Sequence, residues 1–254
     1  GDVSAGGDEA GGLIGRSTGD VKNASASGNV TANGSRAGGL VGQSDGNVTS
    51  SSASGDVSAG EDEAGGLIGQ SDGAVDTSSA SGNATTNGSR AGGLVGQANG
   101  TVSNSEASGD VSAGGNEAGG LLGQSNAAVN NASASGTVSA DGSRVGGLIG
   151  QSDGDVTSST ANGTVNASGN EAGGLVGQSN AAVKNSSASG DVSANGNTVG
   201  GLLGESNGAV SSSTASGDVA ATGPNTGALI GNQSSEKAIT DSAASGDVQV
   251  DGNS

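Results

Sequence analysis

The feature that most constrains the fold of this chain is an internal repeat with a period of about 27 residues. A valine follows each of the first eight repeat leucines by eight residues, from Val21 to Val210, and Ile239 replaces it in the last copy after a two-residue insertion. The repeat leucines, separated by one constant interval, are Leu13, Leu40, Leu67, Leu94, Leu121, Leu148, Leu175, Leu202 and Leu229. A period of this length is typical of solenoids, in which each repeat packs against its two neighbours.

Composition alone would favour a disordered chain. The 254 residues include 54 glycines and only 39 leucines, isoleucines and valines together, and the formal net charge is −18. So little apolar surface compensates poorly for the conformational entropy lost on folding. However, 51 of the 54 glycines fall into six fixed columns of the repeat, where we expect positive φ angles or close approach of the backbone. This regularity favours an ordered repeat protein over a flexible linker.

The segments of each repeat favour strands, because they are short and rich in glycine, serine, threonine and valine. In the second copy we predict three extended pieces, at residues 37–43, 47–54 and 56–59. Three sides make a triangular coil, and every strand would pair with its copy one repeat further along the chain. The sequence therefore predicts an all-β fold in one domain, residues 1–254. We expect a right-handed, triangular parallel β-solenoid (β-helix) of nine coils, roughly 43 Å long at about 4.8 Å per coil.

A second aliphatic residue follows every repeat leucine. These residues are Ile14, Val41, Ile68, Val95, Leu122, Ile149, Val176, Leu203 and Ile230. Neighbours on a strand normally point to opposite faces. Two interpretations stay open: the chain bends here and buries both residues, or the column is an exposed aliphatic stripe for lateral packing.

Another column alternates in charge along the stack. Its members are Glu9, Arg36, Glu63, Arg90, Glu117, Arg144 and Glu171. We expect a ladder of opposite charges up one corner, in which individual exposed pairs contribute at most about 1 kcal/mol. Its main predicted effect is on register, since a slip by one coil would stack like charges.

The recurring sequence Ala-Gly-Gly-Leu-(Ile/Val)-Gly-Gln-Ser, as at residues 37–44 and 172–179, resembles the GLUG motif. That motif occurs in tandem in bacterial and archaeal surface proteins, including adhesins and some secreted peptidases. The resemblance extends over the whole chain and implies an extracellular β-solenoid stalk. It implies no catalytic residues, because the active sites of peptidases in that family lie outside the repeats.

The residue types that are missing exclude several functions. The chain has no cysteine, histidine or aromatic residue, so disulfides, His/Cys metal sites, catalytic triads and base-stacking platforms are ruled out. Its acidic character opposes binding to nucleic acid and to anionic membranes. It also contains no apolar run of 18 residues, so we expect no membrane insertion. We therefore predict that the protein is not an enzyme.

Calcium is the one cofactor that the carboxylates leave open, since it binds oxygen ligands in acidic loops. The candidate ligands are Asp153, Asp155, Glu61 and Asp62. Positions equivalent to Asp153 vary among aspartate, asparagine and threonine, which argues against a dedicated site in every coil. A solvated acidic surface is the simpler interpretation, and it would suit a high-salt organism.

The sequence also contains Asn-x-Ser/Thr sequons, the acceptors of N-linked glycans. They begin at Asn23, Asn29, Asn33, Asn47, Asn83, Asn87, Asn99, Asn131, Asn162, Asn166, Asn185 and Asn232. In a chain so rich in asparagine, serine and threonine about half of them would arise by chance, so ordinary turn and strand chemistry remains the alternative.

These observations lead to a functional hypothesis. The chain begins and ends on the repeat pattern, without an atypical capping segment at Gly1 or at residues 251–254. Open strand edges at both ends would bind further copies. We therefore expect a structural subunit of an extracellular or cell-surface filament, with copies of itself as partners, end to end and laterally. The alternatives are a stalk segment of an adhesin and, third, an ice- or glycan-binding module.

Overall fold

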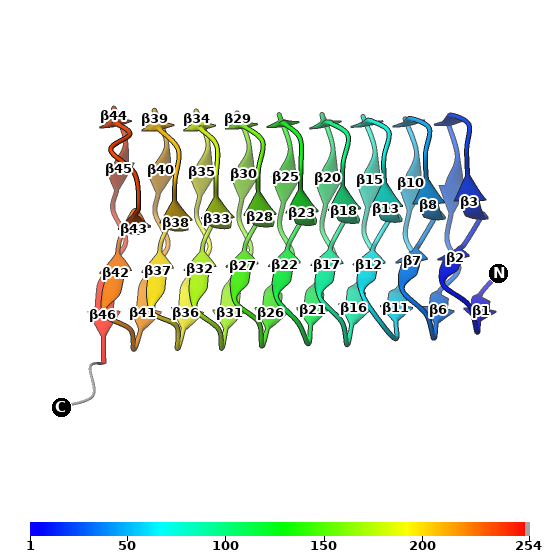
Figure 1. Cartoon of the computed structure of the whole chain (residues 1–254), viewed down its shortest axis with the longest axis horizontal. Helices are drawn as coiled ribbons and strands as arrows, with labels where there is room; N and C mark the ends of the chain where they lie inside the picture. Colours follow the sequence, from blue (N-terminus) through cyan, green and yellow to red (C-terminus); the bar gives the residue numbers. More distant parts are fainter. Residues whose placement is uncertain (252–254) are drawn as a thin grey trace.

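The computed structural model describes residues 1–251, and these form a rod of stacked rungs (Figure 1). We number the rungs 1 to 9 after the leucines from Leu13 to Leu229. All 46 regular elements are β-strands, and each rung contributes one strand to each of five parallel sheets, which we name A to E in the order in which the chain visits them. None of the residues described forms a helix with the length and apolar character needed to cross a membrane.

Sheets A and B hold the first two strands of each rung. Sheet A contains β1 (Val3–Ala5), β6 (Val30–Ala32), β11 (Val57–Ala59), β16 (Ala84–Thr86), β21 (Val111–Ala113), β26 (Val138–Ala140), β31 (Val165–Ala167), β36 (Val192–Ala194), β41 (Val219–Ala221) and β46 (Val248–Val250). Sheet B contains β2 (Glu9–Gly11), β7 (Arg36–Gly38), β12 (Glu63–Gly65), β17 (Arg90–Gly92), β22 (Glu117–Gly119), β27 (Arg144–Gly146), β32 (Glu171–Gly173), β37 (Thr198–Gly200) and β42 (Asn225–Gly227).

Sheet C holds the longest strands, and sheets D and E hold the shortest. Sheet C contains β3 (Ile14–Ser17), β8 (Val41–Ser44), β13 (Ile68–Ser71), β18 (Val95–Ala98), β23 (Leu122–Ser125), β28 (Ile149–Ser152), β33 (Val176–Ser179), β38 (Leu203–Ser206) and β43 (Ile230–Gln233). Sheet D contains β4 (Val21–Lys22), β9 (Val48–Thr49), β14 (Val75–Asp76), β19 (Val102–Ser103), β24 (Val129–Asn130), β29 (Val156–Thr157), β34 (Val183–Lys184), β39 (Val210–Ser211) and β44 (Ile239–Thr240). Sheet E contains β5 (Ser25–Ala26), β10 (Ser52–Ala53), β15 (Ser79–Ala80), β20 (Glu106–Ala107), β25 (Ser133–Ala134), β30 (Thr160–Ala161), β35 (Ser187–Ala188), β40 (Thr214–Ala215) and β45 (Ala243–Ala244).

The predicted parallel β-solenoid is confirmed. Neighbouring strands pair in parallel at an offset of one repeat, as between Val30 and Val57 in sheet A. The three extended pieces predicted for the second copy correspond to five consecutive strands. Residues 37–43 cover most of β7 and β8, 47–54 cover β9 and β10, and 56–59 cover β11, the first strand of rung 3. The two-residue insertion lies in rung 9, between β43 and β44, and the pairing beyond it is kept, with Val210 opposite Ile239.

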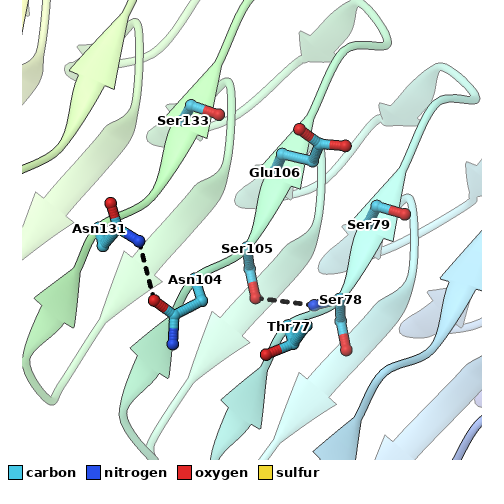
Figure 2. Close-up of a pocket in the computed structure, with 8 residues that line it drawn as sticks. All are labelled: Thr77, Ser78, Ser79, Asn104, Ser105, Glu106, Asn131 and Ser133. Atoms are coloured by element: carbon cyan, nitrogen blue, oxygen red, sulfur yellow. Dashed lines mark hydrogen bonds between the residues drawn. The ribbon is translucent and has the colours of Figure 1, made fainter.

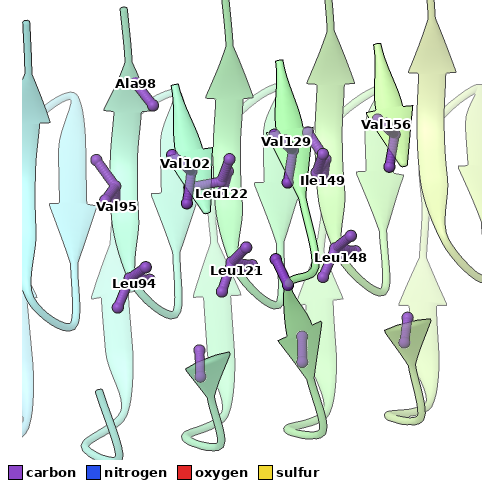
Figure 3. Packing of buried hydrophobic residues seen from close by; sticks show 14 of the residues in the cluster. Leu94, Val95, Ala98, Val102, Leu121, Leu122, Val129, Leu148, Ile149 and Val156 are labelled. Carbon is purple, nitrogen blue, oxygen red and sulfur yellow. The ribbon is translucent and has the colours of Figure 1, made fainter. Parts of the chain in front are cut away.

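The leucine and the aliphatic residue after it both point into the core. The N–H groups of Leu40 and Val41 donate to the same acceptor, the carbonyl oxygen of Leu67 in the next rung, at 2.9 and 3.1 Å. Two successive N–H groups pointing one way require a bend, so both side chains turn inward and are fully buried. The exposed-stripe alternative is therefore wrong for the interior rungs. Figure 3 shows the counterparts of these side chains in rungs 4 to 6, where they pack near the sheet D valines Val102, Val129 and Val156.

A second apolar layer, between sheets A and B, consists of valine and alanine. It is interrupted at rung 4, where Ala84 replaces the valine and Thr86 replaces the alanine of the other rungs. The apolar side chains of rungs 1 to 3 form one cluster, and Ala91 of rung 4 joins those of the later rungs in another. The core between sheets C, D and E is continuous across the same rung, because Leu94, Val95 and Val102 are all buried there.

The glycine columns are explained by close backbone approach alone. No glycine within residues 1–251 has a positive φ, and that conformation belongs instead to one asparagine, serine, threonine or aspartate in each rung, such as Asn23 and Ser50. At the inward bend, by contrast, a Cβ on Gly119 would collide with the carbonyl oxygens of Leu122 and Leu148. The glycine is required there because two backbones meet where a side chain would stand.

Gly119→Ala is therefore expected to destabilise the rod strongly, by about 3 kcal/mol or more, because rung 5 must change its own bend at Leu122 and also move away from rung 6. Gly7→Ala is the matched control, since a Cβ at Gly7 meets no atom within 4 Å. Urea unfolding followed by circular dichroism measures both. Equal losses in the two variants would contradict this account of the glycine columns.

Candidate functional site

The charged column lies on sheet B and forms separate ion pairs. Arg36 pairs with Glu9 at 3.4 Å, and the arginines of rungs 4 and 6, Arg90 and Arg144, each pair at 2.7 Å with the glutamate of the rung before. Each arginine thus bonds to the preceding rung, although its strand pairs equally with both neighbouring strands. The result is one ion pair for every two rungs, so the charged column repeats in pairs of rungs.

In the charged column, Arg36 and Arg90 also contact the rung that follows them. Arg36 Nη1 donates to Gln70 Oε1 at 3.0 Å, and Arg90 Nη1 approaches Gln124 Oε1 at 3.4 Å. The guanidinium groups therefore connect three successive rungs. Burial raises the pKa of Glu63 and of Glu117, while the arginines beside them lower it. Part of the attraction is thus offset by desolvation, and the pairs contribute more to register than to net stability.

The column of charges ends without an arginine. Glu171 in rung 7 is followed by Thr198 in rung 8 and by Asn225 in rung 9. Its Oε2 atom is buried and has no hydrogen-bond partner. Every other glutamate of the predicted ladder is followed by an arginine in the next rung, whereas Glu171 is not.

The calcium candidates fall into two pairs in different rungs, and each carboxylate is bonded to groups of the chain. Asp153 accepts hydrogen bonds from Gln151 and Asn180, and Asp155 pairs with Lys184 at 3.1 Å. Lys184 and a backbone N–H lower the pKa of Asp155. Glu61 accepts a hydrogen bond from Ser35 Oγ at 2.9 Å, and Asp62 faces Ser89. Among residues 1–251 no three carboxylates gather into a group that could hold a metal ion.

The sequons differ in which atom of the asparagine side chain is engaged. All their asparagines are exposed except Asn232, which is half-buried. Asn29, Asn47 and Asn83 accept a backbone N–H of the next rung through Oδ1, at 2.9 Å in each case, which leaves Nδ2, the atom that carries a glycan, outside this bond. In contrast, Nδ2 of Asn99 donates to Asp72, and Nδ2 of Asn131 donates to Asn104. The first group is therefore better suited to modification.

Two polar ladders were missed at the level of sequence. On the corner after sheet C, Asn126 donates to Asn99 and Asn99 donates to Asp72, each at 2.6 Å, so the aspartate forms the acceptor end of an amide ladder. Beside sheet E, the buried hydroxyl of Ser78 accepts the N–H of Ser51 and donates to the carbonyl of Asp76. The signal for both was present at the repeat interval, since the first column is mostly aspartate or asparagine and the second is mostly serine.

The outer face of sheet E is a shallow groove lined by hydroxyl groups. Figure 2 shows part of it, where Ser79, Glu106 and Ser133 project from successive rungs beside Asn104 and Asn131. Further hollows continue along the face from Ser25 to Ser135. Residues 24–27 and their eight counterparts contain a single charged residue, Glu106. An acidic rod thus carries one nearly neutral face.

The comparisons with known proteins support the repeat assignment. The family model described as the GLUG motif matches residues 6–31, 33–58, 87–112, 141–166 and 168–193, which together make up about half of the chain. The chain belongs to the GLUG-motif family, as its motifs predicted. Searches of the curated proteins and of the solved structures gave no match.

The ion pairs generate a stability prediction. Arg90→Gln should lower stability by about 2 kcal/mol at neutral pH, because it leaves Glu63 ionised, buried and without its cation. This loss should shrink in acid, where Glu63 becomes protonated. Arg16→Gln, the same change at an exposed arginine, should have little effect. Thermal unfolding at neutral and acidic pH measures both, and a loss that persists unchanged in acid would contradict the assignment.

Proposed function

We propose that the protein is a structural subunit of an extracellular or cell-surface filament, in which solenoid rods stack end to end. One observation carries the proposal: neighbouring rungs share the same backbone pairing throughout the rod, so the edge strands of one rod match those of another. The edge strands of the five sheets are β1 to β5 on one side and β42 to β46 on the other.

The exposed core residues support this proposal. Leu13 is 54% exposed, whereas Leu40, its counterpart in rung 2, is fully buried. At the other end Ile239 is 45% exposed, Val248 43% and Val250 48%. A rung placed on either end would bury these side chains, at about 25 cal/mol for each Å² of apolar surface removed from water. It would also satisfy a row of N–H and C=O groups that otherwise bond to water.

Charge and register are compatible with such a joint. In rung 9 the position equivalent to the charged column is occupied by the neutral Asn225. A following copy would therefore place its Glu9 next to an amide and not next to a carboxylate. Strand β46 occupies in the tenth turn the place that β1 occupies in the first. If sheets B to E are to continue across the joint, either β1 or β46 must be displaced from its place in sheet A.

The proposal predicts that purified rods lengthen with concentration in negative-stain electron micrographs, in steps of one rod. Ile239→Lys should prevent this, because it places an ammonium group in the apolar surface of the last rung. Thr157→Lys is the control, since it adds the same charge to the side of the rod, in the column where Lys22 and Lys184 occur naturally. Single rods at every concentration would contradict the filament proposal.

That outcome would favour the second candidate, a stalk segment of a cell-surface adhesin. Membership of the GLUG-motif family supports it, since a rod with uniform pairing also suits a rigid spacer. In a stalk, further rungs of the same polypeptide would cover the ends, and the isolated rod would stay monomeric. The extracellular or cell-surface location belongs to both candidates.

The neutral groove on sheet E favours a third candidate, a surface that binds ice or a neutral glycan. It predicts activity of the single rod, in thermal-hysteresis or glycan-array assays, which Ser79→Asp would abolish. The outward column of sheet A, with Thr31, Ser58 and Thr85, is less regular. Ser58→Asp is therefore the matched control.

A further inference from the structure

The contact between rungs 7 and 8 differs from every earlier contact in the rod. In rungs 1 to 6 each glutamate of the charged column is followed by an arginine, which bonds to it across the rung boundary. Across the next boundary Glu171 on β32 lies opposite Thr198 on β37, so the position of the guanidinium is taken by a side chain without charge. One buried oxygen of Glu171 has no partner.

The surroundings of Glu171 add negative charge. In the column of sheet C where rungs 2 to 7 carry glutamine, rung 8 carries Glu205, on β38. The Glu205 carboxylate accepts a hydrogen bond from Ser234 Oγ at 2.8 Å, and its strand β38 packs against β32, the strand of Glu171. Arg144 on β27 lies in register with Glu171 in the rung before, but its guanidinium is bonded to Glu117 of rung 5. Gln178, on β33 of the same rung as Glu171, is neutral.

We propose that the contact between rungs 7 and 8 is a pH-sensitive element, which loosens when Glu171 is ionised and tightens when Glu171 is protonated. When ionised, this half-buried carboxylate keeps one buried oxygen without a hydrogen-bond donor and has no arginine on the side of rung 8, and the strands on either side can relieve this by separating. A protonated carboxyl carries no charge and can donate a hydrogen bond. The strands from β37 onward therefore open more readily at neutral pH than in mild acid.

The titration of Glu171 agrees with this geometry. Burial first, and the Glu205 carboxylate second, raise the pKa of Glu171 above its usual value, while Arg144 lowers it. Because the pKa is higher in the folded state than in the unfolded chain, the stabilising effect is complete below the unfolded value. It is lost as the pH rises through the folded value. Burial raises the pKa of Glu63 and Glu117 as well, but protonating either of them also loses an ion pair.

Hydrogen exchange of the complete chain tests the proposal. The reporter is the Thr198 N–H, which donates to the Asn170 carbonyl across the boundary at 2.8 Å. Its protection, corrected for the intrinsic effect of pH, should rise as the pH falls from neutral to mildly acidic. The limit is about tenfold for each pKa unit that separates the folded from the unfolded state.

Two variants separate this mechanism from general acid effects. Glu171→Gln should give high protection at neutral pH and a flat pH profile at Thr198. Thr198→Arg restores the pattern of rungs 2, 4 and 6, and should raise protection across β37 and β38 at neutral pH. Glu106→Gln, at an exposed glutamate of the sheet E groove, should keep the profile of the unaltered chain. An unchanged profile in Glu171→Gln, or lower protection at neutral pH in both variants, would overturn the proposal.

One consequence rests on the proposed function. Rungs 8 and 9 form one end of the rod, so a pH-dependent opening there would make end-to-end stacking stronger in mild acid than at neutral pH. The exchange measurement needs only a single rod and does not depend on filament formation. Failure of stacking and failure of the pH-sensitive contact are therefore distinguishable.

Discussion

Hydrogen bonding between the backbones of successive rungs is the interaction on which the rest of this structure depends. A chain with few large apolar residues cannot compensate for its lost conformational entropy through burial alone. Here the N–H of Leu40 donates to the carbonyl of Leu67, and the equivalent bond joins each rung to the rung that follows it. Because the bonds lie between rungs, even a thin core is enough to hold the stack, provided that every rung presents the same groups at the same height.

This constraint decides what each column can hold. Glycine occupies the bend because neighbouring backbones meet there, as the carbonyls around Gly119 demonstrate. Polar columns are limited in another way, since an amide such as Asn99 must both accept from the rung after it and donate to the rung before it. A carboxylate can only accept, which is why Asp72 stands at the end of its ladder. A substitution in any column therefore acts on two contacts, and substitutions in neighbouring rungs will not be additive.

The period alone was enough to predict the parallel pairing, its offset and the columns of Leu40 and Val48, because stacking converts each repeat interval into a contact. It could not decide whether Val41 is buried, since that depends on a bend made by two N–H groups sharing one acceptor. It also could not predict that Arg90 bonds to Glu63 and not to Glu117. Both glutamates are equally distant in sequence, and only the orientation of the side chain in space separates them.

The charged column also determines which errors of register the rod can reject. A slip by one rung would stack Glu63 on Glu117 and Arg90 on Arg144, whereas a slip by two rungs restores opposite neighbours. The leucine and valine columns are nearly uniform, so they reject neither slip. Discrimination against a slip of one rung therefore rests on the charges of rungs 1 to 7, and it disappears where Thr198 and Asn225 replace them. In rung 9 the two-residue insertion before Ile239 takes over this role, because the lengthened rung cannot exchange places with a rung of ordinary length without leaving a bulge.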